Sequence, residues 1–430
     1  MTPDTITQPA PDHALDLDNH PWKLRFFVIW SGQALSLIGS ALTQFILVWW
    51  ITSTTGSPTA LAIAGIMGLL PQALFGPLGG TLADRWSRRL IMIGADVITA
   101  LCMLVLIVLF ATDTVQLWHL YGLMFVRSSM QAFQAPASMA STSMLVPPSW
   151  LARVAGMNQT LYGLMSVAAA PLGAVALAYL PLQGALMIDV VTAILGIVPL
   201  FFFAIPQPRQ SGAAPTSVWQ DFRSGLQLVL NNRGLVWLYS ITVLMVAVVM
   251  PSLVLIPLLV RDVFGGGVNE VALMEGVGGA GMLLGGVLVS VITLPRSRVS
   301  VILGTFAFAC IAIAFMGLTP STLFWVAVLW WFVSGFFYTV GNAPVLAILQ
   351  TIVPNEMQGR ALSLFATLMG VAGPLGLIFA APLGELIGVR GLLVGGGVLG
   401  TLVCLSGFLS PHLMRIEDPQ SPTQEASTSD

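Results

Sequence analysis

Charge is scarce in this sequence. Only 34 of the 430 residues are charged, 16 Lys and Arg and 18 Asp and Glu, which is 8%, whereas soluble domains carry about 25%. Hydrophobic residues make up 56%, and the mean hydropathy is +0.90. So few charges cannot cover a surface that faces water, which excludes disordered, fibrous and most soluble globular chains. The composition indicates a membrane protein with several spanning segments.

Lysine and cysteine are scarce as well. Lys23 is the only lysine, and the net charge is −2, so no basic patch for nucleic acid is expected. Cys102, Cys310 and Cys404 lie far apart in apolar stretches, which favours small buried side chains over disulfides or metal ligands. The chain has no phosphate loop of nucleotide hydrolases and no histidine metal motif, so we expect neither direct use of ATP nor a cofactor.

Long apolar segments fill most of the chain. A helix needs about 20 mostly apolar residues to cross a hydrocarbon core about 30 Å thick. The segments do not alternate as the strands of a membrane barrel do, so we predict an all-α polytopic membrane protein. About twelve spanning helices are predicted, at residues 26–51, 58–82, 90–112, 117–146, 152–179, 184–205, 235–260, 268–294, 299–318, 321–350, 360–387 and 391–414.

Basic residues sort to one side of these spans. With the N-terminus in the cytosol, thirteen of the 16 Lys and Arg fall in cytosolic loops and tails, and only Arg261 and Arg390 fall outside. This asymmetry predicts that both termini are cytosolic. Residues 1–21 and 415–430 are polar, and residues 1–21 lack the basic start and apolar core of a signal peptide. We therefore expect two disordered cytosolic tails.

Residues 206–234 divide the spans into two groups of six, at 22–205 and 235–414. The stretch from Gln207 to Pro215 has a linker composition, and Ser217 with Gln220 fits a helix capping box. The apolar side chains that follow recur at helical spacing, which predicts an amphipathic helix on the cytosolic membrane surface. They are Val218, Trp219, Phe222, Leu226, Val229 and Leu230.

The two groups of spans look like a diverged repeat. Pro147 and Arg153 are six residues apart, as are Pro354 and Arg360, and the offset between the pairs is 207 residues. Two parallel six-helix halves are typical of transporters with a substrate site between the halves. Further pairs keep the same order: Ala135-Pro136 with Ala343-Pro344, and Ala170-Pro171-Leu172-Gly173 with Gly373-Pro374-Leu375-Gly376.

A loop rich in glycine and arginine follows the second predicted span. Its glycines would let two helices approach, and its acid could pair with an arginine and latch the two halves together on the cytosolic side. Anchoring in the membrane would explain the arginines alone, but not the glycines or the Asp-Arg spacing. The candidate gating residues are Gly79, Gly80, Asp84, Arg85, Arg88 and Arg89. The loop resembles the signature of the major facilitator superfamily.

Further segments resemble one branch of that superfamily, the drug:proton antiporters that include macrolide efflux proteins. They are Phe125–Pro136, Leu145–Pro147, Arg153–Gln159, Leu186–Asp189, Asp221–Leu226 and Met274–Gly281. The resemblance implies a twelve-helix fold in the bacterial inner membrane that exports amphipathic small molecules. The corresponding loop of the second half departs from the signature, because no acid occurs between Gly285-Gly286 and Arg298 before the next span. Any latch is therefore expected on one side only.

We single out four ionisable residues inside predicted spans: Asp96, Arg127, Asp189 and Glu275. Such residues are costly in lipid, so we predict that they couple proton movement to transport, with the permanently charged Arg127 as partner of a carboxylate. Each has an alternative. Asp96 could bond to the Arg85–Arg89 cluster, and Asp189 could make a helix contact at the outer edge. Glu275 could face the outer water, and Arg127 could extend to the outer surface.

Polar, aromatic and methionine side chains inside the spans are candidates for a substrate pocket, although each could instead pack against a helix or lipid. As a set they suit large, mostly apolar ligands with a few polar groups. They are Gln33, Gln44, Trp49, Met67, Gln131, Asn158, Tyr162, Trp331, Tyr338 and Asn342.

The sequence thus predicts an exporter and not an enzyme. We expect it to work by alternating access and proton antiport, with an amphipathic small molecule, protons and the lipid bilayer as partners, no nucleic acid, and a monomeric state. Among substrate classes, we expect antibiotics such as macrolides first. Export of an endogenous siderophore or lipid is the alternative. An integral membrane enzyme is a remote alternative, because the sequence offers no cluster of nucleophile, base or metal ligands near a membrane interface.

Overall fold

The computed structural model of the chain describes residues 22–203, 205, 218–292 and 297–417, and within them every regular element is helical. The predicted all-α class is confirmed. The predicted tails, the Gln207–Pro215 linker and Ser217 lie outside the described residues. The helices are α1 (Trp22–Thr55), α2 (Pro58–Arg85), α3 (Arg88–Ala111), α4 (Leu117–Leu145), α5 (Leu151–Tyr179), α6 (Leu182–Phe202), α7 (Val218–Asn231), α8 (Arg233–Phe264), α9 (Val268–Val291), α10 (Arg298–Leu318), α11 (Phe324–Ile352), α12 (Asn355–Phe408) and α13 (Pro411–Met414), with a 3₁₀ turn at Pro148–Trp150.

Ten helices of the described chain are long and apolar enough to cross a membrane. Helix α4 has 29 residues but a more polar composition and is not among them. Helix α12 has 54 residues and breaks at Gly388, where φ is 72° and ψ is 165°, a left-handed conformation that favours glycine. At about 1.5 Å per residue, α12 is more than twice as long as a hydrocarbon core is thick. The count of twelve spans stays a prediction.

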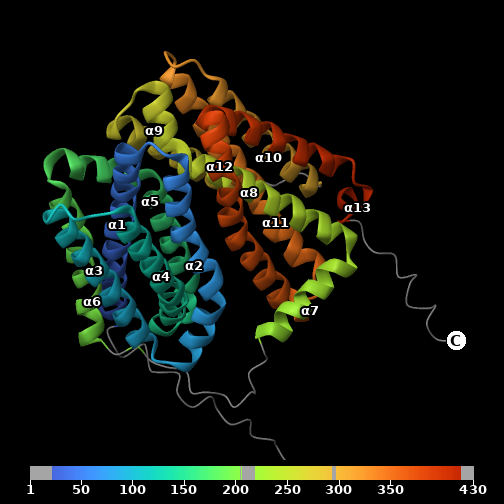
Figure 1. Cartoon of the computed structure of the whole chain (residues 1–430). Helices are drawn as coiled ribbons and strands as arrows, with labels where there is room; N and C mark the ends of the chain where they lie inside the picture. The colour runs from blue at the N-terminus through green and yellow to red at the C-terminus, as the bar shows by residue number, and fades with distance from the viewer. Residues whose placement is uncertain (1–21, 204, 206–217, 293–296, 418–430) are drawn as a thin grey trace, which may run out of the picture.

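The helices form two bundles (Figure 1). Helices α1 to α6 pack against one another on one side, and α8 to α12 do so on the other. The bundles meet mainly along α2 with α12 and α5 with α9, and α8 also contacts α1 and α2. Helix α7, whose existence the apolar spacing predicts, packs on α12 and α8 of the second bundle.

Short polar caps set the turns between neighbouring helices. The Ser57 hydroxyl accepts a hydrogen bond from the Ala60 amide at the start of α2, and Ser87 caps α3 in the same way. The Asn232 side chain accepts from the Gly234 and Leu235 amides in the first turn of α8. Such caps satisfy amide groups that the helix itself leaves unpaired.

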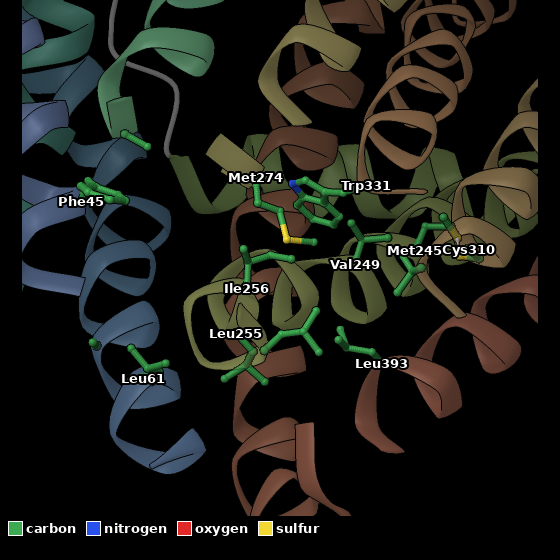
Figure 2. Close-up of a cluster of buried hydrophobic side chains, with 14 of the residues drawn as sticks. Phe45, Leu61, Met245, Val249, Leu255, Ile256, Met274, Cys310, Trp331 and Leu393 are labelled. Carbon is green, nitrogen blue, oxygen red and sulfur yellow. Dashed lines mark hydrogen bonds between the residues drawn. The ribbon is translucent and has the colours of Figure 1, made fainter. Parts of the chain in front are cut away.

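The second bundle is held by a dense apolar core. Figure 2 shows part of it, with Met245, Val249 and Ile256 from α8 near Trp331 from α11. The sulfur atoms of Cys310 and Cys404 lie 3.6 and 3.4 Å from the Met245 sulfur, and all three cysteines are free and buried, as predicted. Lipid tails are as apolar as these side chains, so the close van der Waals fit stabilises the bundle.

Candidate functional site

A cavity of about 710 Å³ lies between the two bundles. Helices α1 to α5 form one wall, and α8 and α9 form the other. Apolar side chains such as Phe45, Leu69 and Met250 cover much of its surface. The polar side chains that line it are Ser40, Gln44, Gln72, Asp96, Thr99, Arg127, Ser128, Gln131, Gln134, Tyr162 and Glu275. Large apolar surfaces with a few polar groups are typical of small-molecule sites.

A buried ion pair lies at the wall of this cavity. The Arg127 Nη2 atom is 3.1 Å from Asp189 Oδ2, and the two side chains are 10% and 1% exposed. Ser40 donates a second hydrogen bond to Asp189 Oδ1 at 2.8 Å. The Arg127 side chain therefore does not extend to the surface, and Asp189 makes contacts from α6 to α4 and α1. A buried ion pair depends on both charges, so protonation of the acid would release the arginine.

The other terminal nitrogen of Arg127, Nη1, is buried and has no hydrogen-bond partner in the described part of the chain. A guanidinium group carries five N–H donors in a fixed fork. Buried donors are normally satisfied. The geometry therefore leaves Arg127 with donor capacity beyond its bond to Asp189.

Asp96 belongs to a separate network of amides. It is 3% exposed, and its carboxylate accepts from Gln33 Nε2 at 3.1 Å and from Gln134 Nε2 at 2.5 Å. Gln134 also donates to the Gln33 side-chain oxygen at 3.2 Å. The alternative of a bond between Asp96 and the Arg85–Arg89 cluster is wrong, because glutamine amides hold the carboxylate.

Glu275 has surroundings unlike those of the two aspartates. It is half-buried and lines both the central cavity and a side cavity of about 270 Å³. Glu275 thus faces cavities of the bundles, and its depth relative to the outer water stays a prediction. Within the described residues no side chain or amide bonds to its carboxylate.

Seven of the ten predicted pocket residues line at least one of three cavities. Gln44, Gln131 and Tyr162 line the central cavity, and Trp331 and Tyr338 line the side cavity. A third cavity of about 110 Å³ lies within the first bundle. It is lined by Gln33, Gln131, Asn158 and Tyr162, and Asn158 accepts a hydrogen bond from Trp30 Nε1 at 2.8 Å. Trp49 and Met67 pack against the apolar core, and neither they nor Asn342 line these three cavities.

The glycine- and arginine-rich loop lies at one end of the first bundle. A side chain at Gly79 would meet the Ala132 carbonyl of α4, whereas Gly80 faces open space. The expected close helix approach is thus made by Gly79. Arg85 is exposed, Arg88 donates to the carbonyls of Ala83 and Ala140, and Arg89 donates to that of Phe201. The Asp84 side chain lies outside the described part, so the latch stays a prediction.

Three contributing residues were missed by the sequence reasoning. Gln134 and Ser40 hold the two aspartates, and nothing but a position within a span distinguished them. Glu385 also falls within the predicted span 360–387 and belonged with the ionisable residues there. Its carboxylate accepts from the Ser57 hydroxyl at 2.7 Å and so joins α12 to the start of α2. Its position in the span was the available signal.

Comparison with known proteins places this architecture among transporters. The sequence model of the Major Facilitator Superfamily matches residues 29–377. Macrolide efflux protein A of Streptococcus pyogenes is 32% identical over 387 residues, which cover 90% of this chain and 95% of that protein. Multidrug efflux pump Tap of Mycolicibacterium fortuitum is 24% identical, with 89% and 95% covered. The structure of the nucleoside transporter NupG has the same fold, with a TM-score of 0.72, 12% identity, and 90% and 98% of the two chains covered.

Proposed function

Since the chain belongs to the Major Facilitator Superfamily of membrane transporters, we propose that it exports amphipathic small molecules, macrolide antibiotics first among them, in exchange for protons. It would act in the bacterial inner membrane, with both termini in the cytosol as the thirteen predicted cytosolic basic residues indicate. The two bundles, residues 22–205 and 235–414, would rock against each other around the central cavity.

The size and surface of the central cavity support this substrate class. A volume of about 710 Å³ lies in the upper part of the range of about 300–1,000 Å³ for small-molecule sites. Its mostly apolar wall with amide and hydroxyl groups fits a large molecule that carries a few polar groups. The names of two relatives, a macrolide efflux protein and a multidrug efflux pump, support the same class.

The observation that carries the proton step is the Arg127–Asp189 pair. Arg127 of α4 lines the cavity, and its Nη2 atom lies 3.1 Å from Oδ2 of Asp189 on α6, which does not itself line the cavity. A proton on Asp189 would remove the negative charge that holds Arg127, whose charge is permanent. The freed guanidinium and the neutral acid would then favour a different packing of the helices. Inward proton movement supplies about 2.3 kcal/mol per 100 mV from the membrane potential alone.

The test is uptake of labelled macrolide into inverted membrane vesicles with and without an imposed pH gradient. In the wild type we expect a pH gradient to stimulate uptake. Asp189→Asn and Arg127→Ala should each reduce gradient-driven uptake by about tenfold or more, since each leaves a buried partner unpaired. Exchange of labelled for unlabelled macrolide, which needs no net proton movement, should persist in Asp189→Asn.

Asp262→Asn is the matched control, because Asp262 is an exposed acid near the end of α8. It should behave as the wild type does. Gradient-driven uptake that survives both Asp189→Asn and Arg127→Ala would remove the pair from the coupling step. A wild type that moves no macrolide under any gradient would refute the proposed substrate class, and growth of a deletion strain under iron limitation would then test siderophore export.

A further inference from the structure

The side cavity of about 270 Å³ adjoins the central one. It lies among α5, α8, α9 and α11, and Leu253 and Glu275 line both spaces. Its other walls are largely apolar or aromatic, with Val249, Met282 and Trp331 among them. Figure 2 shows Trp331 within the buried cluster to which Val249 and Met274 also belong. The side cavity therefore shares part of its wall with the central cavity, and we call it the arm of that cavity.

Four polar groups line this arm with their hydrogen-bonding capacity unused. They are the Glu275 carboxylate, the Trp331 indole nitrogen and the hydroxyl groups of Ser334 and Tyr338. Within the described residues none of them has a hydrogen-bond partner in the protein. Trp331 is 6% exposed, and buried polar groups are normally bonded. An arrangement of unpaired groups around an enclosed space favours a ligand that completes their bonds.

The charged side chains that line the two adjoining cavities indicate the sign of the charge that such a ligand would carry. Among the side chains that line them, Arg127 is the one basic residue, and its guanidinium is bonded to Asp189. Glu275 therefore has no cationic partner of its own in the described structure. A half-buried carboxylate without a counter-ion is costly to ionise, and a positively charged ligand group would offset that cost.

Glycines place the aromatic wall of the arm. A side chain at Gly278 would overlap the indole ring of Trp331, and one at Gly335 would meet the Gly278 carbonyl at 2.7 Å. The absence of side chains at these positions lets α9 and α11 approach. Trp331 thereby comes to line the same small space as Glu275. Tyr338 is fixed by stacking on Phe306 with ring centroids 5.8 Å apart.

We infer that this arm binds a positively charged amino group of the substrate, with Glu275 as its counter-ion and Trp331 and Tyr338 as aromatic walls. A cation is attracted both by a carboxylate and by aromatic ring faces. About 270 Å³ holds an amino sugar or similar group but not a whole macrolide, whose apolar body would occupy the central cavity. This assignment rests on the proposed function and makes Glu275 a specificity-determining residue.

The experiment compares two forms of one macrolide in the inverted vesicles. The first carries a dimethylamino sugar, and the second has been N-demethylated and N-acetylated, which removes the positive charge. Glu275→Gln should raise the half-saturating concentration of the cationic form about tenfold, which corresponds to the loss of one charge-assisted contact. It should leave the neutral form within about twofold of the wild type, still stimulated by the pH gradient.

Two further variants keep the result interpretable. Glu275→Asp retains the charge and should recover much of the preference for the cationic form. Trp331→Leu removes an aromatic wall without touching the acid and should also weaken the cationic form more than the neutral one. Glu270→Gln is the matched control, because Glu270 is an exposed acid of the same helix whose carboxylate caps the Gly267 amide at 2.7 Å.

Equal effects of Glu275→Gln on both forms, or no effect on either, would overturn the inference. So would loss of pH stimulation with the neutral form, because Glu275 would then carry the proton. If the wild type transports neither form, the proposed function itself is overturned and this inference with it. Transport of both forms by the wild type with no discrimination in any variant would overturn the inference alone.

Discussion

Three acids inside the described helix bundles, two buried and one half-buried, differ in what neutralises them. Asp189 faces the guanidinium of Arg127, and Asp96 accepts from two glutamine amides. Glu275 has no partner among the described residues and faces the adjoining cavities. Because the cost of a buried charge depends on its partners, the three carboxylates are suited to different tasks. We assign the proton to Asp189 and the substrate cation to Glu275, and we expect a structural role for Asp96.

The structural role of Asp96 is testable through Gln134. Gln134→Met removes one of the two donors to a buried carboxylate and should lower the free energy of unfolding by about 1–3 kcal/mol. The same change in an Asp96→Asn background should cost less, since the lost bond is then between neutral groups. The measurement is a double-mutant cycle on thermal unfolding of the purified protein in detergent.

Gln131→Met is the control for that cycle. Gln131 lies on the same helix and lines the same central cavity, and no hydrogen bond to its side chain occurs in the described structure. It should cost clearly less than Gln134→Met. Equal costs of Gln134→Met in the two backgrounds would show that Gln134 does not act through Asp96.

Charge scarcity made the acids of the spans easy to find in the sequence, but not their partners. Arg127 and Asp189 are 62 residues apart on different helices, and their contact depends on how α4 and α6 are rotated and placed. An error of one residue in a helix face turns a side chain by about 100°. Gln33 and Gln134 gave still less signal, because polar side chains in a span are compatible with many contacts.

At the scale of the elements, the glycines of α9 allow this helix to pack closely against two neighbouring helices, α5 and α11. Side chains at Gly276 and Gly279 would collide with α5 of the first bundle, at Val167 and Ser166. Those at Gly278, Gly281 and Gly285 would collide with α11 of the second bundle. Small residues let membrane helices approach closely. Helix α9 is thus packed on two sides at once and lies where the bundles must move.

Gly279→Ala tests the α5–α9 contact. Its added methyl group would overlap the Ser166 carbonyl oxygen, so the two helices must separate, and overpacking of this kind costs about 1–3 kcal/mol. We expect initial macrolide uptake in inverted vesicles to fall about tenfold while the protein still folds by size-exclusion profile. Gly286→Ala is the control on the same helix, because its methyl group would lie 3.8 Å from Thr339. Equal activity of the two variants would refute the argument.

Most elements were predictable because a spanning helix must be long and apolar. The predicted span 26–51 corresponds to α1 (Trp22–Thr55), and 299–318 to α10 (Arg298–Leu318). Helix ends were missed by up to several residues, as at α8, which begins at Arg233 after the Asn232 cap and not at residue 235. The predicted boundary between the last two spans falls at Gly388, where the backbone leaves the helical conformation and a kink divides α12 into two helices.

At the scale of the whole molecule, polar contacts tie the two bundles together at one end. This is the end that the distribution of basic residues predicts to be outside. Arg261 at the end of α8 donates to the Thr52 carbonyl of α1 at 2.7 Å. Glu385 of α12 accepts from the Ser57 hydroxyl at 2.7 Å and from the Thr59 amide at 3.4 Å. Both contacts join segments more than 200 residues apart, which no local pattern in the sequence could reveal.

These ties should bias the protein toward the conformation closed at that end. Glu385→Gln combined with Arg261→Met should increase the population that opens there by about threefold, a modest effect because exposed charged contacts contribute little. The measurement is labelling of a Gln44→Cys reporter in the central cavity by an impermeant maleimide added outside intact cells. The three native cysteines are buried, which keeps the background low. Glu270→Gln should leave labelling unchanged, since Glu270 caps only its own helix. If the double variant labels at the wild-type rate, the ties do not set the balance between the two conformations, and the apolar packing of α2 on α12 and of α5 on α9 must set it instead.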